Sequence, residues 1–245
     1  MTTLFLPLDT SGTTHLLCDA DGTLFPSEEP AYEASTDVAN ALLAELGADR
    51  AYTPAELQQM TNGKNFRAGA AQLAEALGRT LDPADLDRWV VQEKDVVTAH
   101  LRTALVPDAA VHDPLVGLAD RFTLAAVTSS ARSRLDTCLD VTGLDHLFSP
   151  ELRFSAEDSL PVPTSKPDPA VYLFAAEALR IAPAQGLAVE DSINGALSAV
   201  AAGHPTVGTV QFVPPAERAA RTQALREAGV AAVVASWAEL VELLG

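Results

Sequence analysis

The chain has 245 residues, of which 48% are hydrophobic, and its formal net charge at pH 7 is −17. This length and apolar content provide a sizeable core and exclude a disordered protein. Acidic residues outnumber basic residues by 33 to 16, which argues against nucleic acid or an anionic membrane as the main partner. An anionic substrate stays compatible with the composition, because local cations and a bound metal outweigh the net field at a site.

The first fourteen residues are expected to form a short irregular arm. They lack the basic region and the long apolar region of a signal peptide, and no apolar run in the chain is long enough to span a bilayer. The two cysteines, Cys18 and Cys138, lack the spacing of a metal site or of a disulfide framework. We therefore expect a cytoplasmic protein with both thiols reduced in its core. The sequence does not determine the oligomeric state, and a monomer is favoured.

The first strand is predicted at His15–Cys18, and it ends in the motif Asp19-Ala20-Asp21-Gly22-Thr23. Two acidic residues two positions apart on an extended chain point the same way. Such a pair can bind a hard cation and can attack or protonate a phosphate ester. Because a β-turn with ordinary turn acids would look the same, this motif alone does not decide between the two interpretations.

The region from Tyr32 to Thr103 is predicted to be helical throughout. Apolar residues recur at helical spacing up to Leu46, and Gly47 ends that run. Thr53-Pro54 has the form of an N-cap followed by proline at the first helical position. Further helices are predicted at 68–77 and 83–101.

After Pro107, short β-rich runs alternate with helical segments. One of the helices is expected to open with Asp168 as its N-cap and Pro169 at its first position. Strands separated by helices indicate βαβ units and a parallel sheet. The predicted strands are 122–127, 186–189, 206–210 and 231–234, and the predicted helices are 133–139, a segment from 169 and 195–202.

Polar side chains gather at the carboxyl ends of these predicted strands. Right-handed crossovers place those ends along one edge of a parallel sheet, and the functional site of such a sheet lies outside that edge. The residues concerned are Asp19, Asp21, Thr128, Ser129, Glu190 and Asp191.

Four motifs in this order give the chain a family resemblance: Asp19–Thr23, Thr128 after an apolar strand, Lys166 before Pro167, and Glu190-Asp191-Ser192. With them the chain resembles the haloacid dehalogenase-like hydrolase superfamily, in its helical-cap branch of phosphatases and β-phosphoglucomutase-like proteins. The resemblance covers nearly the whole chain. It implies an α/β fold, with a Rossmann-like doubly wound parallel sheet as the catalytic core (residues 1–28 and 104–245) and an inserted α-helical cap domain (residues 29–103).

The resemblance implies a division of labour among the site residues. Asp19 would attack phosphorus and form an aspartyl-phosphate, and Asp21 would protonate the leaving oxygen and then activate water. Thr128 would hydrogen-bond a phosphoryl oxygen with Ser129 nearby, although a threonine at a strand end can also be a simple cap. Lys166 would offset the charge on Asp19 and on the phosphoryl group, where an ordinary lysine would be solvated.

A magnesium ion is the implied cofactor, because it relieves the repulsion between an attacking carboxylate and a phosphate dianion. Asp19 and Asp191 would supply carboxylates and Asp21 its backbone carbonyl. Glu190 is either a further ligand or a neighbour of the ligands. The other interpretation of Glu190-Asp191 is an acidic pair at a helix N-terminus.

Substrate specificity is expected to come from the cap, in the segment 61–67. A glycine there allows close approach, and two cations suit an anionic or hydroxyl-rich substrate; a solvated turn between helices is the alternative. The candidate substrate-binding residues are Gly63, Lys64, Asn65 and Arg67. Arg132 and Arg134, which follow the Thr128 loop, could also reach the substrate, but a surface position is favoured.

The predicted function is a magnesium-dependent phosphatase for a small phosphorylated metabolite, with sugar phosphates as the first candidates. Asp21 argues against a dehalogenase, because those relatives lack a carboxylate at this position. A β-phosphoglucomutase-like enzyme is the alternative, but such enzymes carry a histidine about ten residues after the second aspartate, and Glu28–Tyr32 contains none. A phosphonate hydrolase, which would need a cap lysine such as Lys64, and a non-catalytic phosphosugar-binding protein are weaker alternatives.

Overall fold

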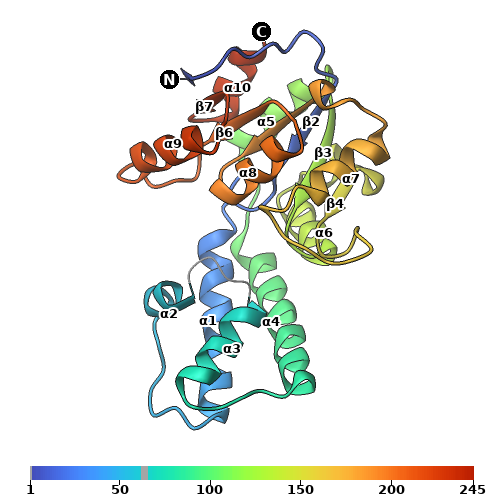
Figure 1. Cartoon of the computed structure of the whole chain (residues 1–245). Coiled ribbons are helices and arrows are strands. Elements are labelled where there is room, and N and C mark those ends of the chain that lie inside the picture. The colour runs from blue at the N-terminus through green and yellow to red at the C-terminus, as the bar shows by residue number, and fades with distance from the viewer. Residues whose placement is uncertain (1, 62–65) are drawn as a thin grey trace. The chain divides into compact units, whose positions relative to one another are not determined.

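The computed structural model of the chain describes residues 2–61 and 66–245. The chain divides into two compact units, one formed by Met1–Pro26 with Leu105–Gly245 and the other by Ser27–Ala104 (Figure 1). The second unit is therefore an insertion in the sequence of the first. Within the described residues, no helix is both long and apolar enough to cross a membrane.

The first unit contains a seven-stranded sheet with the order β1-β7-β6-β5-β2-β3-β4. All neighbouring strands are parallel except β1 and β7, which pair antiparallel. The α/β class predicted from the sequence, with its parallel sheet, is thus confirmed. The strands are β1 Thr3–Leu4, β2 His15–Cys18, β3 Thr123–Thr128, β4 Arg153–Ser155, β5 Gly186–Glu190, β6 Thr206–Thr209 and β7 Ala232–Val234.

Helices follow most strands of this sheet, as βαβ units require. The central strands are buried along both faces, so they read as continuous apolar runs in the sequence. One face of β2 and β3, with Leu17, Ala125 and Val127, packs in a core cluster with Val171 and Tyr172. The helices of this unit are α5 Ala109–Ala119, α6 Arg132–Val141, α7 Ala170–Leu179, α8 Ile193–Ala201, α9 Arg218–Glu227 and α10 Trp237–Leu244, with short 3-10 helices η1 Asp145–Leu147, η2 Pro150–Leu152 and η3 Pro183–Gln185.

The second unit consists of helices in its described part: α1 Glu28–Glu45, α2 Pro54–Thr61, α3 Phe66–Ala76 and α4 Pro83–Ala104. One of its clusters joins Val38 and Leu42 of α1 to Trp89 of α4. At the start of α2, the Thr53 hydroxyl accepts from Glu56 N at 3.3 Å, and the Glu56 carboxylate accepts from Thr53 N at 2.8 Å. This reciprocal capping is the reason that α2 begins where the sequence predicted it.

Two sequence expectations about local structure are wrong. The N-terminal arm is not irregular throughout, because Thr3–Leu4 forms β1 on the edge of the sheet, and two residues are too few to show an alternating pattern. The helix α7 begins at Ala170, so Pro169 occupies the capping position and Asp168 precedes it. The Asp168 carboxylate still accepts from Ala170 N at 2.9 Å, although Asp168 lies one residue before the capping position.

Candidate active site

Three neighbouring parallel strands, β5, β2 and β3, bring the predicted residues to one edge of the sheet. Cys18 at the end of β2 is in register with Val189 of β5 and Ala126 of β3. Asp19 therefore follows β2 at the same level as Glu190, and Asp19 N donates to Val189 O at 3.0 Å. The end of the third strand is Thr128.

Lys166 lies in the middle of this edge rather than in solvent, with 7% of its surface exposed. Its ammonium donates to Asp19 Oδ1 at 2.6 Å, to Glu190 Oε1 at 2.7 Å and to Val127 O at 2.7 Å. These three contacts use all three donors of the ammonium group. The lysine is consequently held as a fixed positive charge between two carboxylates from different strands.

Two buried carboxyl groups, those of Asp19 and Glu190, share this one ammonium, and the pKa values of both are raised. Burial raises the pKa of Asp19, and the charge of Lys166 opposes that effect. Burial, with the charge of Asp19 added, raises the pKa of Glu190 to about 8. Burial alone would lower the pKa of Lys166, but the two carboxylates outweigh it and raise that pKa.

Glu190 is completely buried, and its two carboxyl oxygens differ in their hydrogen bonds. Oε1 accepts from Lys166 and, at 2.5 Å, from the hydroxyl of Tyr172 on α7. Oε2 has no hydrogen-bond partner among the described residues. It lies so close to Gly195 of α8 that a β-carbon there would overlap the carboxyl group. Tyr172 was not predicted, because nothing in its helical surroundings in the sequence marks a polar partner.

Asp191 is held by two side chains, Thr23 and Arg221. The Thr23 hydroxyl donates to Asp191 Oδ1 at 3.1 Å and to Asp19 Oδ2 at 3.3 Å. Arg221 of α9 donates to the Asp191 carbonyl at 2.8 Å and lies 3.5 Å from Oδ2. Gly22 has a φ of +79°, and a β-carbon at this position would overlap the Asp191 carboxylate, so the turn requires glycine.

Asp19, Glu190 and Asp191 each offer a ligand atom, and these atoms lie within 4.8 Å of one another. A buried set of carboxylates is the kind of donor set that a hard divalent cation prefers. The unsatisfied Oε2 of Glu190 supports the fit, because a buried carboxylate oxygen without a partner is costly unless a cation or water approaches it. The residues present therefore fit a magnesium-type ion.

Asp21, at the turn after β2, contacts the segment that follows β3. The Ser130 hydroxyl donates to Asp21 Oδ2 at 2.7 Å, and Arg134 Nη2 donates to Asp21 Oδ1 at 2.9 Å. The expectation that Arg134 lies at the surface is wrong, since its side chain is only 23% exposed and is paired with Asp21. The pairing joins residues 113 positions apart, so no local pattern could indicate it.

Thr128 and Ser129 have structural contacts in the same loop. Thr128 is buried, and its hydroxyl oxygen accepts from Ser130 N at 3.0 Å, which is the strand-end cap that the sequence left open. The Ser129 hydroxyl oxygen accepts from Lys166 N at 3.1 Å, so this loop also fixes the backbone that carries the lysine.

The predicted cap residues are only partly described. Gly63, Lys64 and Asn65 lie outside the described residues. Arg67, in the first turn of α3, is exposed and donates to Asp87 of α4 at 2.6 Å within the helical unit.

Comparison with known proteins identifies the family. The model of the haloacid dehalogenase-like hydrolase family matches residues 13–203. A phosphoglycolate phosphatase from Psychrobacter arcticus is 40% identical over 87 residues, and this match covers 36% of each chain. The match therefore spans only about a third of that curated relative.

Two solved structures are similar over nearly their whole length. A candidate phosphoglycolate phosphatase from Lactobacillus plantarum is 26% identical with a TM-score of 0.68, covering 94% of this chain and 99% of its own. A candidate β-phosphoglucomutase from Thermotoga maritima is 26% identical with a TM-score of 0.68, covering 95% and 98%. Since the family model matches more than half of the sequence and the fold agrees, this chain belongs to the haloacid dehalogenase-like hydrolase family.

Proposed function

We propose that the protein is a phosphatase that hydrolyses the phosphate ester of a small metabolite and uses Asp19 as its nucleophile. The observation that carries the proposal is the buried contact of 2.6 Å between Lys166 Nζ and Asp19 Oδ1, beside the acidic cluster. A fixed ammonium at this point offsets charge where a carboxylate and a phosphate must meet. Family membership and the similarity to a phosphoglycolate phosphatase support the same class of reaction.

In the proposed mechanism, Asp21 transfers a proton twice. An Asp19 oxygen first attacks phosphorus, the bond from phosphorus to the ester oxygen breaks, and Asp21 gives its proton to that oxygen. Asp21 then takes a proton from water, whose oxygen attacks phosphorus and releases Asp19 and inorganic phosphate. Asp21 is close enough for its charge to contribute to the raised pKa of Asp19, which supports this pairing. Thr128 and Ser129 are proposed to bind phosphoryl oxygens.

Mg²⁺ is the proposed cofactor. The carboxylates of Asp19 and Asp191 and the backbone carbonyl of Asp21 would hold it, with Glu190 as a further ligand or as a neighbour of the ligands. The buried, unsatisfied Oε2 of Glu190 favours direct participation. When bound, the ion supplies positive charge that stabilises the phosphoryl group and the attacking carboxylate.

The proposed substrates are small phosphorylated hydroxy compounds, with sugar phosphates first and 2-phosphoglycolate included because of the curated relative. The helical unit, 29–103 in the sequence prediction, is proposed as the cap that selects among them. A phosphomutase is the second candidate, because one similar structure carries that description. The absence of a histidine in Glu28–Tyr32 favours the phosphatase.

The test is release of inorganic phosphate from a panel containing sugar phosphates, 2-phosphoglycolate and p-nitrophenyl phosphate, with Mg²⁺ and with EDTA. We expect turnover that EDTA abolishes and Mg²⁺ restores. Asp19→Asn should lower kcat by at least about 10³-fold, because the covalent nucleophile is lost. Asp140→Asn, at an exposed position of α6, is the matched control and should behave like the wild type.

Two results would contradict the proposal. Turnover by Asp19→Asn within a few-fold of the wild-type rate would exclude the nucleophile, and indifference to EDTA would exclude the metal. A separate assay with glucose 1-phosphate isomers should detect no isomerised product; its appearance would favour the phosphomutase.

A further inference from the structure

The carboxyl group of Asp21 accepts hydrogen bonds from two residues in the segment that follows β3. Ser130 and Arg134 each donate one hydrogen bond to it, at 2.7 Å to Oδ2 and 2.9 Å to Oδ1. We propose that Ser130 and Arg134 are positioning residues that fix the orientation of the Asp21 carboxyl group for proton transfer. This inference rests on the proposed function, because it gives these residues a role only if Asp21 is the acid and base.

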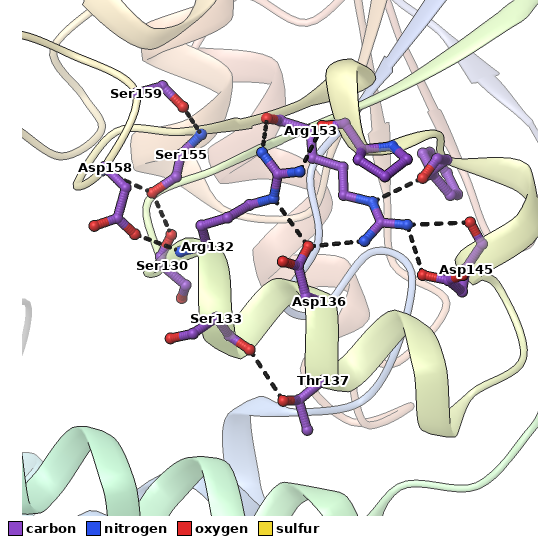
Figure 2. A network of polar contacts seen from close by, with 12 residues as sticks. Ser130, Arg132, Ser133, Asp136, Thr137, Asp145, Arg153, Ser155, Asp158 and Ser159 are labelled. Atoms are coloured by element: carbon purple, nitrogen blue, oxygen red, sulfur yellow. Dashed lines mark hydrogen bonds and ion pairs between the residues drawn. The ribbon is translucent and has the colours of Figure 1, made fainter.

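The loop that carries Ser130 is anchored to the last residue of β4 and to the turn that follows this strand (Figure 2). The Ser155 hydroxyl donates to the Ser130 carbonyl at 2.8 Å, and the backbone N of Arg132 donates to Asp158 Oδ2 at 2.6 Å. Asp158 N in turn donates to the Ser155 hydroxyl oxygen at 3.1 Å. The loop is therefore fixed at the Ser130 carbonyl and at Arg132, the first residue of α6.

The first turns of α6, which carry Arg134, are fixed by a second set of ion pairs. Asp136 Oδ1 accepts from Arg132 Nε at 2.9 Å and from Arg153 Nη1 at 2.8 Å (Figure 2). Arg153 is 5% exposed and also donates to Asp145 at 2.6 Å and to Phe148 O at 2.7 Å. All three nitrogens of this buried guanidinium donate hydrogen bonds, which holds its neighbours in one geometry, so α6 presents Arg134 from a well-supported position.

A carboxyl group that must give and then receive a proton needs a defined direction toward the reacting oxygen. A misplacement of about 1 Å in a catalytic group costs about 10²-fold in rate. Two donors on the two oxygens of Asp21 restrict rotation about its side-chain bonds, and the donors themselves come from supported backbone. Ser130 and Arg134 therefore act through Asp21 and not on the phosphoryl group.

The test compares Arg134→Ala, Arg134→Lys and Ser130→Ala on two phosphate esters, with Mg²⁺ present. Glycerol 2-phosphate releases an alcohol that needs a proton, whereas p-nitrophenolate leaves without one. For glycerol 2-phosphate, Arg134→Ala and Ser130→Ala should lower kcat by about 10- to 100-fold with a nearly unchanged KM. The first turnover of p-nitrophenyl phosphate should change much less, and Arg134→Lys should recover part of the loss.

Two controls separate positioning from folding. Ser133→Ala, at an exposed position of α6, and Arg226→Ala, at an exposed position of α9, should behave like the wild type. In an Asp21→Asn background, Arg134→Ala should cause no further loss of the steady-state rate, because its partner's function is already gone. Thermal unfolding of each variant shows whether the protein is folded under the assay conditions.

The inference is wrong if Arg134→Ala and Ser130→Ala slow both esters equally, or if Arg134→Ala has the same effect with and without Asp21. If Arg134→Ala does not fold, Arg134→Lys and Ser130→Ala provide the test. A wild-type kcat in both of these variants would also overturn the inference. A failure of the proposed function is distinguishable, because the wild-type protein would then show no turnover that depends on Asp19.

Discussion

Lys166, Asp19 and Glu190 are a buried group of three ionisable side chains, and negative charge is in excess when both carboxyl groups are ionised. Each carboxylate contacts the same ammonium, at 2.6 and 2.7 Å. A buried charge pair of this kind adds little net stability, because the cost of removing the ions from water offsets their attraction. A divalent cation beside Asp19 and Asp191 would remove the excess, so the arrangement in the metal-free protein is one that metal binding should stabilise.

The raised pKa of Glu190 predicts how the stability of the metal-free protein depends on pH. The pKa is about 8 in the folded protein and 4.5 for an ordinary glutamate, so the folded state holds an extra proton between these values. Stability from this group is fully present below pH 4.5 and is lost as the pH rises through 8. The slope should reach about 1.4 kcal/mol per pH unit.

Glu190→Gln should remove this pH-dependent contribution to stability. The free energy of unfolding of the variant should therefore fall less between pH 5 and 8 than that of the wild type. The measurement is urea unfolding in EDTA at several pH values. Glu151→Gln, an exposed glutamate of η2, controls for the substitution itself and should follow the wild-type curve. Parallel curves for wild type and Glu190→Gln would show that Glu190 does not hold the extra proton.

The N-terminal turn of α8 is shaped around the carboxyl group of Glu190. Alanine normally stabilises a helix interior relative to glycine, by about 1 kcal/mol. At Gly195, however, a β-carbon would overlap the Glu190 carboxyl, which Lys166 and Tyr172 hold in place. Gly195→Ala should therefore destabilise the protein, by about 1–3 kcal/mol, despite the better helix propensity.

Gly117 of α5 is the matched control for this prediction. It is an exposed helical glycine, and a β-carbon built on it meets nothing within 4 Å. Gly117→Ala should raise the free energy of unfolding by about 0.5–1 kcal/mol. Urea unfolding of both variants in EDTA makes the comparison. An increase for Gly195→Ala as well would mean that Glu190 moves aside freely and that its position is not fixed.

The elements that bear the site could be predicted from the sequence, because they have strong local signals. His15–Cys18 and Gly186–Glu190 are apolar runs that end in acids, and these patterns depend only on neighbouring residues. The strands β1 and β4 were not predicted, since two and three residues show no periodicity. Their existence depends on pairing with strands far along the chain.

The same physical limit applies to the candidate site. The sequence motifs indicated Asp19, Lys166 and Glu190, which the fold brings into contact. The partners that orient them were missed or misplaced: Tyr172 lies on the face of an apolar helix, and Arg134 was expected in solvent. A side-chain contact between distant residues is set by the packing of helices on the sheet, which local patterns do not encode.

On the scale of the whole molecule, the site is formed by segments that are far apart in sequence. The parallel, neighbouring strands β5, β2 and β3 bring these segments together at one edge of the sheet. Between β2 and β3 the chain inserts the helical unit Ser27–Ala104. Like the chain as a whole, this site is acidic, because Lys166 faces three carboxyl groups there. Recognition of an anionic substrate would add cations from elsewhere, and Arg67 is the described candidate in the helical unit.

Arg67→Ala tests whether the helical unit selects the substrate. The ion pair of Arg67 with Asp87 is exposed, so its loss should cost no more than about 1 kcal/mol of stability. If Arg67 binds substrate, kcat/KM for a phosphorylated metabolite should fall about 10-fold or more, while kcat/KM for p-nitrophenyl phosphate should change little. Asp87→Ala breaks the same ion pair and keeps the arginine, so it should leave the ratio of the two kcat/KM values unchanged. Equal effects of Arg67→Ala on both esters, or the same shift in the ratio from Asp87→Ala, would assign Arg67 to the packing of α3 against α4 instead of to specificity.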